Sequence, residues 1–293
     1  MAFAVFVTAV LAAAGAQQQI DALTPREKAA LVVVSGLPAP RGVAGVLIQR
    51  WSRDLPRPRG ALVFADQEGG EARSFDELPP PMAASGYRTA GEARAAGRHT
   101  GSALRLAGVD VDLAPVLDAP DGPLGSRHFR RGAFGVAFAR GLLERGTGAC
   151  VKHFPGLGSA PVSTDERPHV DARIRRSELA VFRAAIREGI PCVMTSNAFY
   201  GSRFRATIDE PTYRRLRRLG FRGVAITDSL SILKHAPVER WARMAIRAGA
   251  DLVLFTDAGF ARRAIRALTP LAARGELDEH VRRVLLFRER FHR

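Results

Sequence analysis

Eight short apolar segments recur along this chain, separated by stretches with helical periodicity, and this alternation limits the folds open to it. Strands that alternate with helices lie parallel, because each helix crosses back over the sheet. No G-x-G-x-x-G follows the first segment, which argues against an open dinucleotide-binding fold. The pattern predicts a single-domain α/β protein, a (β/α)8 TIM-like barrel. The expected strands are 31–34, 43–48, 61–66, 110–116, 148–153, 190–196, 223–228 and 251–256.

Caps and turn residues mark the expected helices. Thr24, Pro25 and Glu27 form a helix start, with Thr24 as the N-cap and Glu27 at the third helical position. Residues 49–60 are too few and too rich in proline for a full crossover helix. We therefore expect a reduced crossover between the second and third strands. The other expected helices are 90–107, 133–145, 176–188, 210–219, 238–248, 259–273 and 278–291.

The formal net charge of +15 raises the hypothesis of a polyanion-binding protein. However, the basic residues are almost all arginines, spread through helical stretches without interleaved aromatic residues. A solvated, arginine-rich surface is the interpretation that we favour. We expect no specific nucleic-acid partner, although a weak and salt-sensitive attraction to polyanions would follow from the charge.

Cys150 and Cys192 each lie in an apolar, strand-like segment. Their number and spacing indicate neither a metal site nor a disulfide framework. We expect two buried thiols in the core, with no information about the redox compartment.

Residues 1–16 are mostly small and apolar, and they end in Ala14-Gly15-Ala16, which is similar to a signal-peptidase site. The apolar run of about fourteen residues is short for a membrane span. We interpret it as an export signal on an exported or cell-envelope-associated protein. The alternatives are a helix packed on the base of the barrel, in a cytoplasmic protein, or a wrongly assigned start. The domain division is 1–16 for this segment and 22–293 for the barrel.

Polar side chains follow the predicted strands at their carboxyl ends, which open on one face of a parallel barrel. Each alone could cap the next helix, but their convergence on one face indicates a site. Carboxylates beside cations suit glycoside hydrolysis, in which one carboxylate attacks the sugar and a second group protonates the leaving oxygen. The residues concerned are Asp66, Asp118, Arg127, Lys152, His153, Asn197, Asp228 and Asp257.

Five motifs, in one order, carry a family resemblance over about residues 25–290. They are DQEGG at 66–70, LAPVLD at 113–118, SRHF at 126–129, KHFPGLG at 152–158 and ITDSL at 226–230. With these motifs the chain resembles glycoside hydrolase family 3, in its single-domain bacterial β-N-acetylhexosaminidase branch. The resemblance implies a retaining exo-glycosidase that removes terminal β-linked amino sugars from cell-wall-type glycans. We expect a carbohydrate substrate, no cofactor, no metal and a monomer.

The resemblance also assigns roles to residues. Asp228 takes the nucleophile position. The sugar-binding positions fall on Asp66, Arg127, Lys152 and His153. Three neighbouring positions depart from the family's pattern. This chain has Ser229 where many relatives have an acidic residue, His128 where serine is usual, and Glu71 where the family has an arginine, with Arg73 nearby.

The proton donor is the larger departure. The family's Asp-x-His pair corresponds, counted without gaps, to Ser163 and Asp165, and the histidine of KHFPGHG is Leu157. The residues left for proton donation are Asp165, Glu166 and His169. We predict Asp165 as the donor and His169 as the second choice. The alternative is a catalytically impaired barrel that binds a sugar or a partner.

Overall fold

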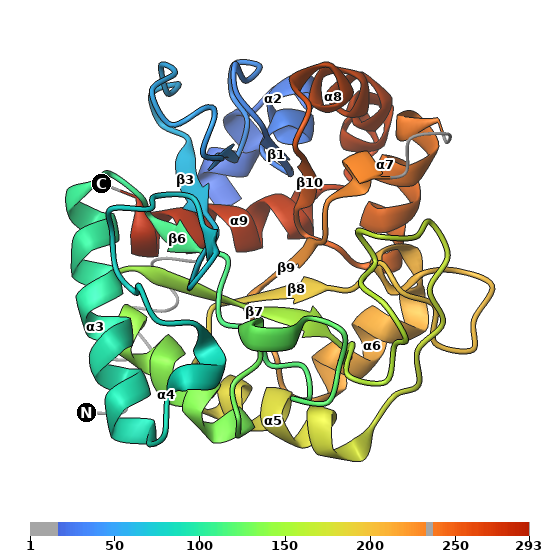
Figure 1. The fold of residues 1–293 in the computed structure, drawn as a ribbon. Helices are drawn as coiled ribbons and strands as arrows, with labels where there is room; N and C mark the ends of the chain where they lie inside the picture. Colours follow the sequence, from blue (N-terminus) through green and yellow to red (C-terminus); the bar gives the residue numbers. More distant parts are fainter. Residues whose placement is uncertain (1–16, 233–236, 293) are drawn as a thin grey trace, which may run out of the picture.

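The eight predicted strands all form, and they pair in parallel around a barrel (Figure 1). This computed structural model describes residues 17–232 and 237–292. A parallel bridge between Ile226 and Leu252 joins the last two strands and nearly closes the barrel, which confirms the predicted fold class. In sheet order the strands are β10 (Val253–Phe255), β1 (Val33–Ser35), β2 (Gly45–Ile48), β3 (Leu62–Ala65), β6 (Val111–Asp112), β7 (Gly148–Phe154), β8 (Cys192–Thr195) and β9 (Val224–Thr227).

The strand residues alternate between two apolar cores, as a pleated strand requires. On β3, Leu62 and Phe64 belong to the core inside the barrel, whereas Val63 and Ala65 belong to the core between barrel and helices. The strands are therefore buried on both faces. This is why they occur in the sequence as continuous apolar segments rather than as alternating ones.

The helices cover the outside of the barrel with boundaries close to those expected. Thr24 caps α2 (Pro25–Ala30) in the predicted capping box with Glu27. At the amino-terminal end of the barrel, α9 (Asp278–Phe291) inserts Phe287 into the interior core. The other helical segments are 17–22, α3 (Ala90–Leu106), α4 (Gly132–Leu143), α5 (Arg176–Arg187), α6 (Glu210–Arg218), α7 (Val238–Ala248) and α8 (Ala258–Ala273).

Two crossovers lack a helix. Residues 49–61, all of which the structure describes, contain none, so the predicted reduction between β2 and β3 is confirmed. The fully described segment 36–44 between β1 and β2 also lacks one, which the sequence did not lead us to expect. On this side α8 packs against β1 and β10, and α2 packs against α8.

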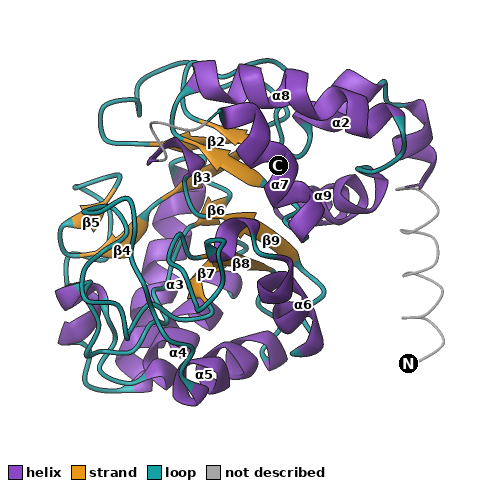
Figure 2. Cartoon of the chain, turned by 90° about the vertical axis from the view of Figure 1, so that its right-hand side faces the viewer, coloured by secondary structure: helices purple, strands orange, loops and turns teal. Residues whose placement is uncertain are grey.

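A small hairpin replaces part of the loop expected after residue 70. Strands β4 (Gln67–Gly69) and β5 (Ala72–Arg73) pair in antiparallel fashion beside the barrel (Figure 2). Gly69 and Gly70 have φ of 113° and 59°, which glycine adopts most readily, so this turn can be tight. Four 3₁₀ segments complete the described elements, and they are η1 (Ala84–Gly86), η2 (Gly125–Arg127), η3 (Ala206–Ile208) and η4 (Leu230–Ile232).

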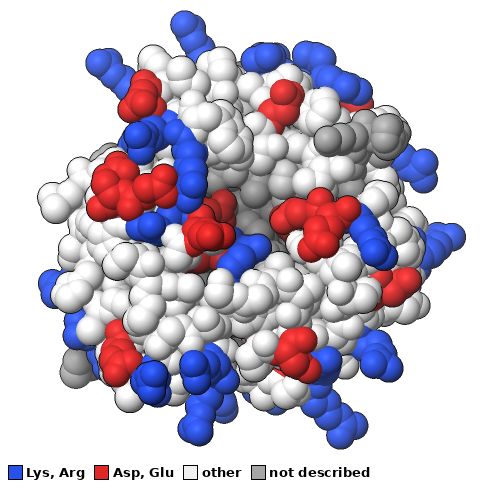
Figure 3. Space-filling view, viewed as in Figure 1, with Lys and Arg blue, Asp and Glu red and all other residues white. Residues whose placement is uncertain are grey.

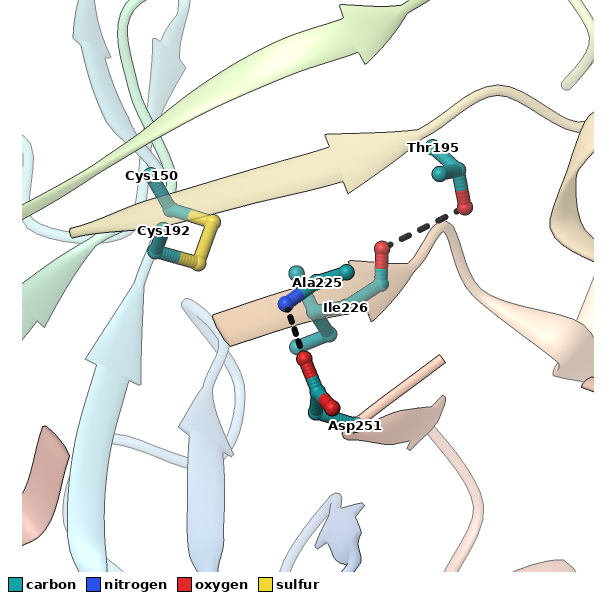
Figure 4. Close-up of a disulfide and its surroundings, with 6 residues drawn as sticks. All are labelled: Cys150, Cys192, Thr195, Ala225, Ile226 and Asp251. Atoms are coloured by element: carbon teal, nitrogen blue, oxygen red, sulfur yellow. Dashed lines mark hydrogen bonds between the residues drawn. A yellow bond between two sulfur atoms is a disulfide. The ribbon is translucent and has the colours of Figure 1, made fainter. Parts of the chain in front are cut away.

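Cys150 on β7 and Cys192 on β8 form a disulfide inside the barrel (Figure 4). The two residues are register partners on neighbouring strands, with Cα atoms 4.3 Å apart. Both are fully buried, as expected, but the prediction of two free thiols was wrong. Their separation of 42 residues reveals no framework in the sequence, because only the register of β7 against β8 brings them together. On the next strand pair, Thr195 donates to the carbonyl of Ile226.

The candidate signal segment, residues 1–16, lies outside the described residues. Among the helices of the described ranges, none combines the length and apolar character that a membrane crossing needs.

Candidate active site

The carboxyl ends of the strands surround a cavity of about 310 Å³. Figure 3 shows a hollow on this side of the molecule, with acidic and basic side chains at its margin. A larger cavity of about 860 Å³ lies between α2 and the end of α9, away from the polar strand ends. The smaller cavity is therefore the candidate active site. Of the predicted site residues, it is lined by Asp66, Arg127, Lys152, His153, Asp165 and Asp228.

One side of the cavity holds four charges in mutual ion pairs, here named the paired cluster: Asp66, Glu68, Arg127 and Lys152. Lys152 Nζ lies 2.6 Å from Asp66 Oδ1 and 2.7 Å from Glu68 Oε1. Arg127 donates to both oxygens of Glu68, through Nε at 2.7 Å and Nη2 at 2.8 Å. Fork-shaped pairing of this kind holds both side chains in one geometry.

Burial by itself would raise the pKa of Glu68, but the charges of Lys152 and Arg127 lower it to about 2. In turn, Asp66 and Glu68 raise the pKa of Lys152 against the effect of burial. Lys152 is 3% exposed and Glu68 4%, so this buried pair forms a fixed frame at the centre of the cluster. Glu68 was not among the predicted site residues, although its motif was. Its burial depends on the β4–β5 hairpin, which the sequence did not predict.

Asp118 fixes the orientation of His153. Its carboxylate accepts from His153 Nδ1 at 2.7 Å, and from the backbone amides of His153 at 3.0 Å and Leu157 at 2.8 Å. Burial opposes ionisation of Asp118, but the His153 charge and these hydrogen bonds leave its pKa lowered. Because Nδ1 donates to Asp118, Nε2 is the ring nitrogen left for a ligand in the cavity.

The cavity is also lined by Asp165 and Asp228, which form no ion pair with any residue in the described part of the chain. Asp228 follows β9 and accepts from the backbone amide of Ser229 at 2.7 Å. Asn197 donates to the carbonyl of Ser229 at 3.0 Å, which holds this segment in place. Burial raises the pKa of Asp228, and the negative charge of Asp165 adds to that effect, against the charges of His153 and Lys152.

The loop after β7 brings one of the three candidate donors to the cavity. Asp165 is exposed to solvent and lines the cavity together with Ser163 and Thr164. Glu166 instead accepts from the backbone amide of Ser163 at 3.2 Å and does not line the cavity. His169 also lies outside the lining, where it stacks on Phe199 with ring centroids 4.1 Å apart.

Two residues at or beside the departures from the family's pattern, Arg73 and His128, make structural contacts. Arg73 donates to the carbonyls of Gly70, Asp76 and Leu78, so it holds the loop after the hairpin, and neither it nor Glu71 lines the cavity. His128 is buried, and its Nε2 accepts from the amide of Leu124 at 3.1 Å. Asp257 caps α8 at 2.7 Å from the amide of Phe260.

Within residues 17–232 and 237–292, no three His, Cys, Asp or Glu side chains are grouped so as to hold a metal ion.

The sequence profile of the glycosyl hydrolase family 3 N-terminal domain matches residues 47–286. The chain belongs to this family. Curated relatives include a β-hexosaminidase of Stenotrophomonas maltophilia, 31% identical over 67% of each chain, and one of Alkalilimnicola ehrlichii, 36% identical over 67% of this chain and 65% of the relative. The chain thus spans about two thirds of the length of these relatives.

Solved structures of the same family also match. The chain is 28% identical to a family 3 β-N-acetylglucosaminidase from Paenibacillus, with a TM-score of 0.80 over 92% of this chain and 63% of that one. It is 25% identical to a β-N-acetylhexosaminidase from Beutenbergia cavernae, with a TM-score of 0.78 over 91% of this chain and 99% of the other. The family resemblance predicted from the five motifs is therefore confirmed.

Proposed function

We propose that this chain is a retaining exo-glycosidase that hydrolyses terminal β-linked amino sugars, most like a β-N-acetylhexosaminidase. One observation carries the proposal: two carboxylates without an ion-pair partner in the described residues, Asp165 and Asp228, share one cavity with a fixed frame of paired charges. Glycoside hydrolysis needs two such carboxyl groups, one to attack and one to donate a proton. The β-hexosaminidase relatives support the same reaction.

In the first step, the Asp228 carboxylate attacks the anomeric carbon as the bond to the leaving oxygen breaks. Asp165 transfers its proton to that oxygen, so the leaving group departs as an alcohol. A water molecule then enters, gives a proton to Asp165 and attacks the glycosyl ester. This releases the sugar with its original configuration and restores both carboxyl groups. The paired cluster and His153 offer hydrogen bonds to sugar hydroxyls.

The size of the cavity supports an exo-acting enzyme. A volume of about 310 Å³ is at the small end of ligand sites, which suits one sugar ring better than an extended chain. We also propose that the protein is a monomer. Light scattering of the purified protein would test the monomer.

Asp228 is tested directly by trapping the covalent intermediate. A slow fluorinated N-acetylglucosaminide should inactivate the enzyme, and mass spectrometry should find the label on the peptide that contains Asp228. The glycosylated Asp228 ester would accumulate because the fluorine slows its hydrolysis. A label on another peptide would overturn the nucleophile assignment. Absence of turnover of every activated aryl N-acetylglucosaminide would instead favour the alternative, a sugar-binding barrel without catalysis.

We also propose export, with cell-wall-type glycans as the substrate. The buried disulfide supports this location, because such bonds persist chiefly in oxidising compartments. The small, apolar residues 1–16 support it as well. Amino-terminal sequencing of the protein from its native cell envelope should find a start near Gln17, and an intact Met1 would contradict cleavage.

A further inference from the structure

A carboxylate outside the cavity joins two loops that both line the site. Glu178 is the third residue of α5, on the outside of the barrel beside β7 (Figure 1). It is 1% exposed. Its Oε1 accepts from the amide of Gly158 at 2.8 Å and from the amide of Ala119 at 3.0 Å. One oxygen atom therefore links the loop after β7 to the loop after β6.

The glycines of KHFPGLG make this approach sterically feasible. A Cβ on Gly156 would lie 2.5–2.7 Å from Glu178 side-chain atoms, and one on Gly158 would lie 2.7 Å from Glu178 Oε1. Gly156 also has a φ of 123°, which larger residues rarely adopt. Glycine is thus required at both positions for the carboxylate to reach the backbone. The motif that marks the family here shapes the contact to Glu178.

Glu178 and Asp118 hold neighbouring amides of the same turn. Asp118 accepts from Leu157 and from His153, whereas Glu178 accepts from Gly158 and from the residue that follows Asp118. A shift of either carboxylate would therefore move the other. The orientation of His153 and the base of the loop that carries Asp165 both depend on this pair of contacts.

The position of Glu178 carries a cost as well as two hydrogen bonds. Glu178 Oε2 is buried without a hydrogen-bond partner among the described residues. A buried polar atom left unpaired destabilises the fold. An apolar side chain in this place would avoid that cost but could not accept from the two amides. The first turn of α5 makes one more tie to the same loops, because Arg175 donates to both oxygens of Asp121 at 2.7 Å.

We propose that Glu178 is a positioning residue of the hydrolytic site, which aligns Asp165 and His153 by joining the two loops through their backbone amides. The proposal rests on the glycosidase function proposed above. A misplacement of about 1 Å at a reacting group can lower a rate by about 100-fold. The effect of removing Glu178 should therefore be large although it touches no substrate.

The test compares Glu178→Ala, Glu178→Gln and the control Glu188→Ala. Glu188 ends the same helix and pairs on the surface with Arg140 at 3.0 Å, away from the cavity. Glu178→Ala should lower kcat/KM for a poor leaving group by about 10- to 100-fold, and less for dinitrophenolate, because the proton donor is displaced. Glu178→Gln keeps an acceptor oxygen and should stay within a few-fold of wild type. Glu188→Ala should match wild type.

Equal losses for both leaving groups, or a Glu178→Ala variant as active as the control, would overturn the positioning role. If Glu178→Ala does not fold, Gly158→Ala takes its place, because its Cβ pushes on the same contact while Glu178 stays intact.

If the wild type turns over no glycoside, the proposed function fails by itself. Amide hydrogen exchange of Ala119 and Gly158 then decides: faster exchange in Glu178→Ala but not in Glu188→Ala supports the link, and unchanged exchange refutes it.

Discussion

The cavity contains two kinds of carboxylate, those of the paired cluster and those without an ion-pair partner among the described residues, and their surroundings act on them in opposite ways. In the paired cluster, Glu68 is held by Lys152 and Arg127, and its pKa falls to about 2. In the same cavity, Asp228 forms no ion pair with a described residue, and burial raises its pKa. The same cavity thus contains carboxylates stabilised as anions and one whose negative charge is disfavoured.

This difference separates binding from chemistry. A carboxylate held by two cations keeps its charge and geometry, so it can orient a ligand but gains nothing by reacting. A partly buried carboxylate with a raised pKa, such as Asp228, gains stabilisation when it forms a neutral ester with the sugar. Perturbed carboxylates that differ in this way within one site are typical of assigned acid and base roles. Variants that change one kind of carboxylate and leave the other intact test this separation.

The largest effect is expected for Asp228→Asn. Activity should fall by about 10³-fold or more, because the nucleophile is lost. The thermal midpoint should rise at neutral pH. A raised folded-state pKa means that Asp228 stabilises the fold below its ordinary pKa and that this contribution is lost as pH rises through the folded-state value. Calorimetry should therefore show a higher thermal midpoint for Asp228→Asn than for the wild type at pH 7, and a smaller difference between the two proteins near pH 3.5. A lower midpoint at pH 7 would contradict the raised pKa.

Asp165→Ala should slow glycosides with poor leaving groups by about 10²- to 10⁴-fold, the usual range for general acid catalysis. Dinitrophenyl glycosides should be slowed much less in the glycosylation step, because their leaving group needs no proton. The control is His169→Ala, whose side chain is 63% exposed and outside the cavity lining. If the histidine variant shows the leaving-group dependence instead, the donor assignment moves to His169.

Glu68→Gln should break the paired cluster. Removing one member of a buried ion pair costs about 3–5 kcal/mol of unfolding free energy, because the remaining charges lose their partner. The lowered pKa of Glu68 means that its contribution is present above its ordinary value and is lost as pH falls toward about 2. Chemical denaturation at neutral and acidic pH measures the loss of unfolding free energy and its dependence on pH. The matched control is Glu77→Gln, an exposed pair with Arg53 for which at most about 1 kcal/mol is expected. Equal losses for the two variants would count against a fixed frame.

The smallest effect concerns pH. The charge of Asp165 contributes to the raised pKa of Asp228, so Asp165→Asn should move the acid limb of kcat/KM for a dinitrophenyl glycoside to lower pH. Because Asp165 is exposed, the shift should be below about one pH unit and should shrink at high salt. An acid limb at the same pH in both proteins would show that the charge of Asp165 does not affect the pKa of Asp228.

Much of the fold could be predicted because its signals are local. The capping box at Thr24 needs only neighbours three residues apart, and the apolar segments between Gly, Pro and polar residues fix where strands begin and end. Parallel pairing and one carboxyl face follow from the alternation of strands and helices. Asp66, Arg127, Lys152, His153 and Asp228 were therefore placed around one cavity from the sequence.

What only the tertiary structure decided depends on contacts between residues far apart in the chain. The disulfide depends on the register of β7 against β8. The burial of Glu68 depends on a hairpin that the hydrophobic pattern of the sequence does not predict. Asp165 and His169 lie four residues apart in one loop, yet only Asp165 reaches the cavity, because Phe199 from another loop holds the histidine. In the sequence, nothing distinguishes Glu178 from the other polar residues of its predicted helix. Its importance comes from two backbone amides, 59 and 20 residues away, that the closed barrel brings to one oxygen atom.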